Sequence, residues 1–242
     1  KGHKIAFNVL NIGRLKLSPL VLGGAKISLA EGARYAQERQ QFGRPLAAFP
    51  LIQQMLAGAC ARIYCHETNV YRTAHDVDRY VEGSGIPDKA AATVAALHAL
   101  SVECSINKVY ASESIDFVVD EMLQLHGGYG FIAEYNAERH YRDARINRIW
   151  EGTSEINRML ITGTLLEKAM KGELPLLPAI KRITDQLMSR TGSRDVPEGE
   201  FGVELATVEL ARKQTLFAAG VAAQKHMQNL DKEQEVLAWL AD

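Results

Sequence analysis

The chain has 242 residues, of which 28 are basic, 29 are acidic and 47% are hydrophobic. A chain of this length can bury the core of one large domain or of two small ones. Because the charges nearly cancel, no overall field attracts nucleic acid or an anionic surface, and a nucleic-acid-binding protein is disfavoured.

Helical periodicity dominates the first two thirds of the chain. Apolar residues recur at three- and four-residue steps from about residue 6 to 39, which predicts a long helix that tolerates a bend at Pro19 or at Gly23 and Gly24. The loop "QFGRPLAAFP" separates it from a helix at about 51–82, and the turn "EGSGIPD" precedes a helix at about 89–125. After "HGGYGF", a segment at 133–147 and a helix at 153–170 complete a predicted all-α antiparallel bundle of residues 1–171.

A second helical region is predicted for residues 172–242, because the composition changes after "KGELPLLP". It contains a helical stretch to about 190, the polar loop "TGSRDVPEGE", and a helix from about 203 to the terminus. In "LPAIKRITDQLMSR" basic residues stand between apolar positions at helical spacing. This pattern is typical of a helix packed in a bundle and also of one that lies on a membrane surface.

The cysteines Cys60, Cys65 and Cys104 are odd in number and show no C-x-x-C spacing. This argues against a disulfide framework and against a zinc site, and no metal site is predicted. We expect three reduced thiols in the core. The compartment is then a reducing one, either a bacterial cytoplasm or a mitochondrial matrix.

Two short motifs carry residues suited to binding an anion. In "ERQQFGRPL", Arg39 and Arg44 follow the first long helix, where a cation either complements the helix dipole or contacts a phosphate as a planar donor. In "QLHGGYGF", Gly127, Gly128 and Gly130 exceed what helix capping requires. Such glycines let backbone N–H groups approach a ligand closely.

A third motif, "RIWEGTSEINR", places Glu151 between Trp150 and a Gly-Thr pair. Thr153 is predicted to be the N-cap of the next helix, and Glu155 suits the positive end of that helix. Glu151 is either a solvated acid before a helix or a base. Apolar neighbours ready a carboxylate to take a proton, whereas the helix end favours its ionised form, so the residues alone leave both interpretations open.

Together "LNIGR", "ERQQFGRPL", "QLHGGYGF" and "YRDARINRIWEGTSEINR", in this order, resemble the C-terminal part of the acyl-CoA dehydrogenases over residues 1–170. The stretch "VLNIGRLKL" and the second helical region, residues 172–242, look most like the very-long-chain branch. The resemblance implies an FAD-dependent enzyme that oxidises an acyl-CoA thioester to the trans-2-enoyl-CoA in fatty acid β-oxidation. It also implies an N-terminal helical domain and a middle β-domain, which these residues do not contain, so the site of this chain alone is expected to be incomplete.

The resemblance also implies roles for individual residues. Glu151 stands at the position of the family's catalytic base, which removes the substrate α-proton while the β-hydride moves to the flavin. The backbone N–H of that residue, with a flavin hydroxyl, would bind the thioester carbonyl. Arg14 would lie near base and substrate, with Asn11 one turn earlier, although many relatives carry aspartate there. Trp150 would wall the thioester pocket, and Gly152 would leave room for the substrate.

Contacts to FAD are implied in the same way. The residues that match them are Arg39, Gln41, Phe42, Gln124, Gly127, Gly128, Thr153 and Glu155. Arg39 matches an arginine that reaches the FAD pyrophosphate of a neighbouring subunit, and the glycine turn matches the segment at the adenosine end. Thr153 and Glu155 match contacts within the home subunit. A site shared in this way implies a homodimer or a homotetramer.

The sequence is also compatible with other functions. The resemblance implies acyl-CoA as substrate and electron-transfer flavoprotein as electron acceptor, but oxidases of the same fold return electrons to oxygen instead. A DNA-binding relative would need a basic face, which a nearly neutral chain disfavours. A non-catalytic helical assembly fragment is favoured if no flavin binds, and the C-terminal region is compatible with peripheral membrane association.

Overall fold

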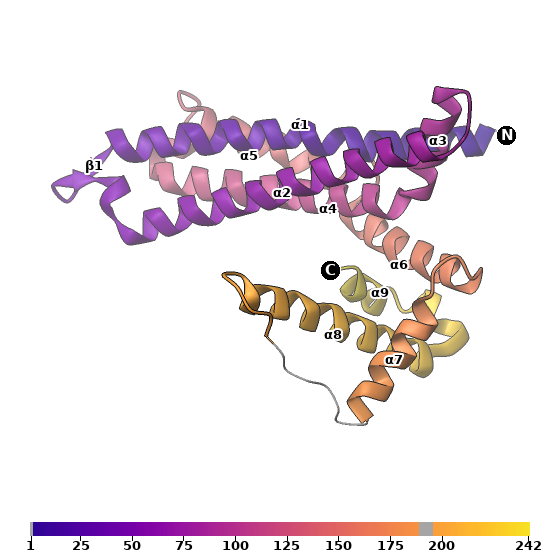
Figure 1. Ribbon diagram of the computed structural model, residues 1–242. Helices are drawn as coiled ribbons and strands as arrows, with labels where there is room; N and C mark the ends of the chain where they lie inside the picture. The colour runs from indigo at the N-terminus through magenta and orange to yellow at the C-terminus, as the bar shows by residue number, and fades with distance from the viewer. Residues whose placement is uncertain (1, 189–195) are drawn as a thin grey trace. The chain divides into compact units, whose positions relative to one another are not determined.

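The computed structural model describes residues 2–188 and 196–242, which are almost entirely helical (Figure 1). This confirms the predicted all-α class. The chain divides into two compact units, Lys1–Asn157 and Arg158–Asp242.

Three long helices form the first unit: α1 (Gly2–Glu38), α2 (Pro50–Gly83) and α4 (Ser101–His126). Figure 1 shows that α2 runs antiparallel to both α1 and α4. The shorter α5 (Asn136–Arg145) follows, and α6 (Ser154–Met170) begins in this unit. As predicted, α1 runs on through its weak point at Pro19.

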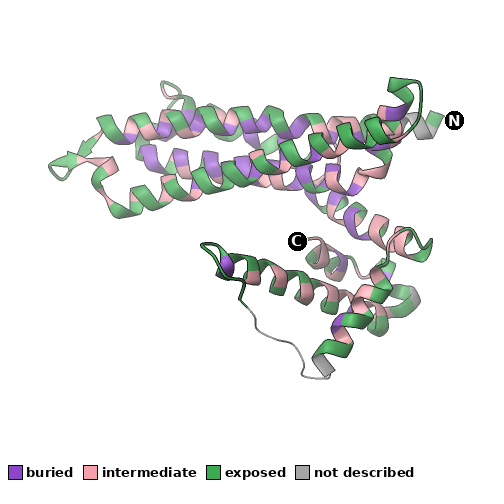
Figure 2. Ribbon diagram, viewed as in Figure 1, coloured by how far each residue is buried: buried purple, intermediate pink, exposed green. Residues whose placement is uncertain are grey.

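The core of this unit lies between α1, α2 and α4, where buried stripes of the helices face inward (Figure 2). Its buried residues are Leu17, Val21, Leu22, Ala25, Ala36, Ala59, Ile63, Ala111, Ile115, Val118, Val119, Met122, Leu125 and Ala144. Two glycines let α1 and α4 pack closely. A Cβ at Gly24 would lie 3.3 Å from Ile115 Cδ1, and a Cβ at Gly32 would overlap Met122 Sδ.

The predicted helix at 89–125 is wrong in one respect, because it is two helices. α3 (Lys89–Ala99) ends at Leu100, whose φ of −98° and ψ of 26° are not helical, and α4 begins at the next residue. No glycine or proline marks the break. The change of direction instead serves tertiary packing, since Leu97 is buried and its carbonyl accepts a hydrogen bond of 3.4 Å from Asn11 Nδ2.

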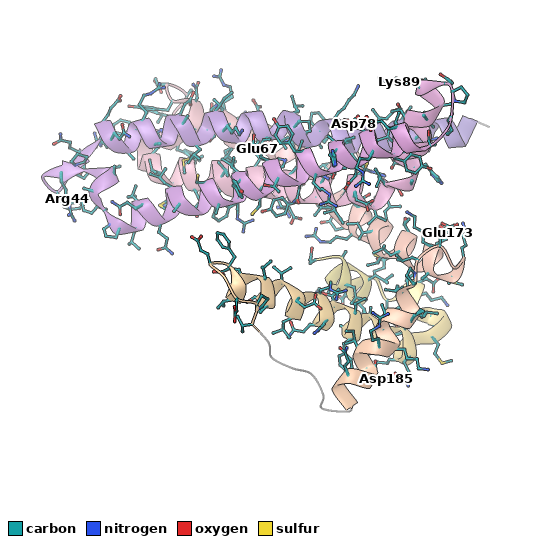
Figure 3. All side chains as sticks on the ribbon, in the orientation of Figure 1. Arg44, Glu67, Asp78, Lys89, Glu173 and Asp185 are labelled. Atoms are coloured by element: carbon teal, nitrogen blue, oxygen red, sulfur yellow. The ribbon has the colours of Figure 1, made fainter. Side chains whose placement is uncertain are left out.

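The loop between α1 and α2 contains more regular structure than predicted. The loop after α1 contains a two-stranded antiparallel sheet, β1 (Gln40–Gln41) and β2 (Arg44–Pro45), followed by the 3₁₀ helix η1 (Leu46–Ala48). Phe42 and Gly43 connect the strands with φ of 54° and 78°, as a tight hairpin turn requires. Figure 3 labels Arg44 in this hairpin, and its guanidinium lies 4.0 Å from the centre of the Phe49 ring.

The second unit contains the end of α6, α7 (Leu176–Met188), α8 (Gly202–His226), the 3₁₀ helix η4 (Met227–Lys232) and α9 (Gln234–Ala241). A Cβ at Gly220 would overlap Ile180, so α7 and α8 pack closely. Of the predicted loop at 191–200, residues 191–195 lie outside the described residues and 196–200 are not helical. The helices that the structure describes include none long and apolar enough to cross a membrane.

The predicted helix from 203 to the terminus is wrong in its length. α8 ends at His226, Met227 takes a φ of 49°, and the chain turns back through η4 into α9. This turn buries Leu230 and Leu237 in a small core with Ala222. Met159 and Leu166 of α6 pack against the same core, which explains why the two units divide within α6 while the predicted boundary, near residue 172, follows that helix.

The prediction of three core thiols is wrong for two of them. Cys104 is buried, but Cys60 and Cys65 are exposed, and all three are free. The buried residues of α2 include Ile63 and His66. Cys60 and Cys65 lie outside that buried stripe of the helix, so their side chains point outward.

Candidate active site

The turn before α6 carries Glu151. The chain leaves α5 through the 3₁₀ helix η3 (Ile146–Arg148) and enters α6 by way of Glu151 and Gly152, whose φ angles are 55° and 83°. Thr153 Oγ1 accepts a hydrogen bond of 3.2 Å from the backbone N–H of Ile156, which confirms Thr153 as the N-cap. We call residues 151–153 the Glu151 turn.

Two buried residues of α1 hold this turn. Arg14 Nε donates to the carbonyl oxygen of Glu151 at 3.2 Å, and an Arg14 terminal nitrogen donates to Asn11 Oδ1 at 2.9 Å. Burial lowers the pKa of the Arg14 guanidinium, and the charges of Cys104 and Glu151 oppose that effect. The predicted pair of Asn11 and Arg14 on one helical face therefore exists, and it acts on the backbone of the Glu151 turn.

The Glu151 carboxylate lies against the backbone of α1. A Cβ placed on Gly13 would lie 2.6 Å from Glu151 Cδ and 2.9 Å from Oε1, so only a glycine leaves room for the carboxylate in this position. The side chain is half-buried. Across the residues that the structure describes, the carboxylate has neither a hydrogen bond nor an ion pair. The carboxylate is thus held against α1, and both of its oxygens can accept a hydrogen bond or a proton.

The neighbours of Glu151 are fixed by polar contacts. Trp150 is 47% exposed and its indole N–H donates to Asn147 Oδ1 at 3.1 Å. At Gly152, a Cβ would lie 3.0 Å from Asn157 Nδ2, so the missing side chain makes room for the protein's own amide group. Glu155, in the first turn of α6, is exposed.

Lys108 of α4 is fully buried, and its Nζ has no hydrogen-bond partner within residues 2–188 and 196–242. Burial lowers the pKa of this ammonium group to about 8, an effect that the Glu155 carboxylate opposes and Arg14 reinforces. Lys108 therefore lies within electrostatic range of Arg14, which holds the Glu151 turn, and of Glu155, which follows the turn.

A second cluster forms a pocket at the other end of α1. Its volume is about 520 Å³. It is lined by Tyr35, Arg39, Gln41, Leu46, Leu125, His126, Gly127, Gly128, Tyr129 and Ile132. We call this hollow the Arg39 pocket.

Aromatic rings and a cation shape the Arg39 pocket. Tyr35 and His126 stack with ring centres 4.1 Å apart, and the Arg39 guanidinium lies 5.1 Å from the centre of the Tyr129 ring. Arg39 has no acidic partner in the described part of the chain, so its hydrogen-bond donors remain available. Gly127 has a φ of 58°, and nothing lies within 4 Å of a Cβ placed on Gly128.

The structure thus divides the predicted site residues between two places. Four of the predicted flavin contacts line the Arg39 pocket: Arg39, Gln41, Gly127 and Gly128. Phe42 stands outside the lining, 92% exposed at the hairpin. Gln124 is exposed on α4, and its carbonyl accepts the N–H of Gly127. The remaining predicted residues surround the Glu151 turn.

Comparison with known proteins decides the family. The model described as "Acyl-CoA dehydrogenase, C-terminal domain" matches residues 1–166, and a second model with the same description matches residues 210–242. The chain belongs to the acyl-CoA dehydrogenase family.

Three relatives within the acyl-CoA dehydrogenase family match over 100% of this chain. A probable acyl-CoA dehydrogenase of Bacillus subtilis is 44% identical over 41% of its own length. The very long-chain specific acyl-CoA dehydrogenase of Rattus norvegicus is 32% identical over 37% of its length. A crystal structure of an acyl-CoA dehydrogenase from Bacillus anthracis, complexed with FAD, is 47% identical with a TM-score of 0.96 over 41% of that chain. The chain therefore spans about two fifths of the length of these acyl-CoA dehydrogenases.

Several residues that shape the candidate site were not identified from the sequence. Tyr35 lies one helical turn before Arg39, and that spacing is the signal that could have found it. His126 stacks on Tyr35 and also lines the pocket. No sequence pattern identifies Gly13 or Asn157. Gly13 contacts Glu151 only through the tertiary fold, and Asn157 donates to carbonyl groups that precede it in the chain.

Proposed function

We propose that this chain supplies the catalytic base and part of the flavin surface of an FAD-dependent acyl-CoA dehydrogenase. One observation carries the proposal: the Glu151 carboxylate is half-buried, stands on a left-handed turn and has free oxygens in the described chain. A carboxylate held in one place without a partner is suited to accept a proton there. The names of the relatives support acyl-CoA thioesters as the substrate class.

The proposed reaction removes a proton and a hydride from adjacent carbons. Glu151 takes the proton from Cα of the acyl chain, and the electron pair of that bond forms the new double bond as the hydride leaves Cβ. FAD, when bound, supplies the hydride acceptor.

Negative charge builds on the thioester oxygen while the proton leaves. The backbone N–H of Glu151 donates no hydrogen bond to any described residue, so it is available to that oxygen. Arg14 keeps the peptide group in place through the Glu151 carbonyl. Trp150 stands beside the base, where an aromatic ring would exclude water from the thioester.

The Arg39 pocket fits the pyrophosphate and adenosine end of FAD by its chemistry. Arg39 offers a planar cation without an acidic partner among the described residues, the glycine turn offers an open backbone surface, and Tyr129 offers an aromatic face. Thr153 and Glu155 stay proposed contacts to FAD beside the base. Phe42 and Gln124 are also proposed contacts to FAD, because both side chains are exposed and a second subunit can reach them.

The separation of the two clusters favours a site shared between subunits. Arg14 and Arg39 are about 25 positions apart along α1, which at the rise of an α-helix is about 37 Å. One flavin ring cannot lie at Glu151 and have its pyrophosphate at Arg39 of the same chain over that distance. We therefore propose a homodimer or homotetramer in which the Arg39 pocket of one subunit contacts the FAD of another.

We also propose that the substrates carry long acyl chains. The rat very long-chain specific enzyme matches the whole chain, tail included, which supports long acyl chains as substrates in fatty acid β-oxidation. We propose electron-transfer flavoprotein as the acceptor. Exposed apolar residues of the tail, such as Leu177 and Trp239, are compatible with peripheral membrane association.

The test uses the full-length protein that contains this chain. The absorbance bands of oxidised flavin are followed anaerobically while acyl-CoA thioesters of four to twenty carbons are added. We expect palmitoyl-CoA to bleach the bands in the wild type. Glu151→Gln should slow bleaching by about 100- to 10,000-fold, because the amide cannot take the proton and a general base contributes a factor in this range.

The outcomes separate the alternatives. Reoxidation by electron-transfer flavoprotein but not by oxygen supports the dehydrogenase, and rapid reoxidation by oxygen indicates an oxidase. Bound flavin that no acyl-CoA bleaches would reject the proposed reaction. A purified protein without flavin would leave a non-catalytic assembly fragment.

A further inference from the structure

The backbone of the Glu151 turn is strained. Glu151 is a non-glycine residue with a φ of 55°, and it is followed by Gly152 with a φ of 83°. The achiral Gly152 adopts a positive φ freely, but the same region is costly for an L-residue such as Glu151 and persists only where the surroundings hold it. Arg14 holds the first carbonyl of the turn, but it does not reach the next two.

One side-chain amide holds those two carbonyls. Asn157 Nδ2 donates to the carbonyl oxygen of Gly152 at 2.8 Å and to that of Thr153 at 3.0 Å. A longer contact of 3.5 Å reaches the carbonyl oxygen of Glu151. Because an amide nitrogen carries two hydrogens, the two short bonds are the main ones.

The surroundings of Asn157 fix which way the amide faces. Its side chain is fully buried, and Asn157 Oδ1 has no partner in the described chain. Three carbonyl oxygens lie on the nitrogen side, and a carbonyl can only accept, so the nitrogen must face the turn. Leaving Oδ1 unsatisfied costs free energy, which indicates that the donor side of this amide is what the site requires.

We propose that Asn157 is a positioning residue that locks the left-handed Glu151 turn and thereby fixes the carboxylate and the backbone N–H of Glu151. The inference rests on the proposed function of Glu151 as base. Asn157 holds the turn from α6, and Arg14 holds it from α1. Without the amide, the carbonyl groups of Gly152 and Thr153 lose their only side-chain donor within the described residues, and the turn relaxes.

The test compares Asn157→Leu, Asn157→Gln and Asn107→Leu in the flavin-loaded full-length protein. Leucine keeps the branched shape of asparagine without the donor, and glutamine keeps the donor. Asn107 of α4 is a matched control, since it is also buried and its Nδ2 donates to the Glu103 carbonyl at 3.0 Å, away from the Glu151 turn. The readouts are kcat, KM, exchange of the substrate α-protons with D₂O, and a crystal structure of each variant.

We expect Asn157→Leu to lower kcat and α-proton exchange by about 100-fold, which is the effect of misplacing a reacting group by about 1 Å. KM and flavin content should stay within about threefold, Asn157→Gln should keep most of the rate, and Asn107→Leu should lose stability without losing rate. In the crystal, Glu151 of Asn157→Leu should leave the left-handed region.

An Asn157→Leu variant with wild-type kcat and exchange overturns the proposal, and so does a crystal structure that keeps the Glu151 turn unchanged. If Asn157→Leu does not fold, Asn157→Ala replaces it, because alanine fits the buried position and also lacks the donor. Failure of the proposed function looks different. Neither the wild type nor Glu151→Gln would then act on acyl-CoA, while the crystal structures would still decide whether Asn157 holds the turn.

Discussion

The Glu151 turn and the Arg39 pocket lie at different places along α1 and are held in different ways. The turn is enclosed by the chain's own buried polar groups, with Arg14 and Asn157 both donating to its carbonyls. The pocket is open and depends on a stacked pair of rings and on glycine backbone, and its Tyr129 is exposed.

The functions that we propose for the two places explain this contrast. A base must stand within a fraction of an ångström of the atom that it deprotonates, so its support must exist before the substrate binds. A surface that meets a cofactor of another subunit is completed by that cofactor, so its own donors are left without partners. Substitutions at the turn should therefore change the rate, and substitutions at the pocket should change flavin affinity.

Among the substitutions that compare these two places, Gly13→Ala should have the largest effect. The new Cβ would lie 2.6 Å from Glu151 Cδ, so the carboxylate must move aside. We expect kcat to fall by about 100-fold, as for a comparable displacement of a reacting group, and the melting temperature to stay or rise, because alanine favours a helix by about 1 kcal/mol over glycine. Steady-state kinetics and thermal unfolding of the full-length enzyme measure both.

Gly23→Ala is the control for that substitution. Gly23 lies on the same helix, and nothing approaches a Cβ placed there within 4 Å. It should gain the same helix stability and keep the wild-type rate. Equal rates for the two variants would mean that the position of the carboxylate against α1 does not matter for catalysis.

A smaller effect, on stability instead of rate, is expected for Lys108. Lys108→Met removes an ammonium group that is fully buried without a hydrogen-bond partner in the described chain, and should raise the free energy of unfolding at pH 7 by about 2 kcal/mol. The pKa of Lys108 is about 8 in the folded chain against 10.5 for the ordinary group. Between these values the unfolded chain binds more protons, so wild-type stability should rise with pH from about 8 to about 10.5.

Thermal unfolding of wild-type and Lys108→Met full-length protein at pH 7 and pH 10 tests this expectation. The gain from methionine should be largest at pH 7 and should shrink at pH 10. A variant that melts lower than the wild type at pH 7 would show that the ammonium group is paired in the complete protein.

The sequence predicted those features that depend on neighbouring residues. Helical periodicity located α1 and α2, and a Thr one position after Gly152 marked the N-cap of α6. The pair Asn11 and Arg14 could be predicted because one helical turn brings such residues together.

Features that depend on distant packing could not be predicted. The break at Leu100 has no local signal and exists because α3 packs toward α1. Nothing near Gly13 in the sequence explains the glycine, because the group that needs the space is the Glu151 carboxylate, 138 positions later in the chain. The stack of Tyr35 on His126 likewise joins α1 to the end of α4, and only the tertiary fold reveals the Arg39 pocket.

The smallest effect is expected at the pocket, where two glycines give opposite readouts. Nothing in this chain lies within 4 Å of a Cβ on Gly128, so Gly128→Ala should leave the melting temperature unchanged and weaken FAD binding by about tenfold, which is about 1.4 kcal/mol. A Cβ on Gly130 would lie 2.5 Å from the Leu123 carbonyl oxygen and 2.9 Å from His126 Cβ, so Gly130→Ala should lower the melting temperature first. Titration of the flavin-free full-length protein with FAD, beside thermal unfolding, separates the two. Unchanged FAD affinity in Gly128→Ala would remove the glycine turn from the flavin surface and leave Arg39 to account for the pocket alone.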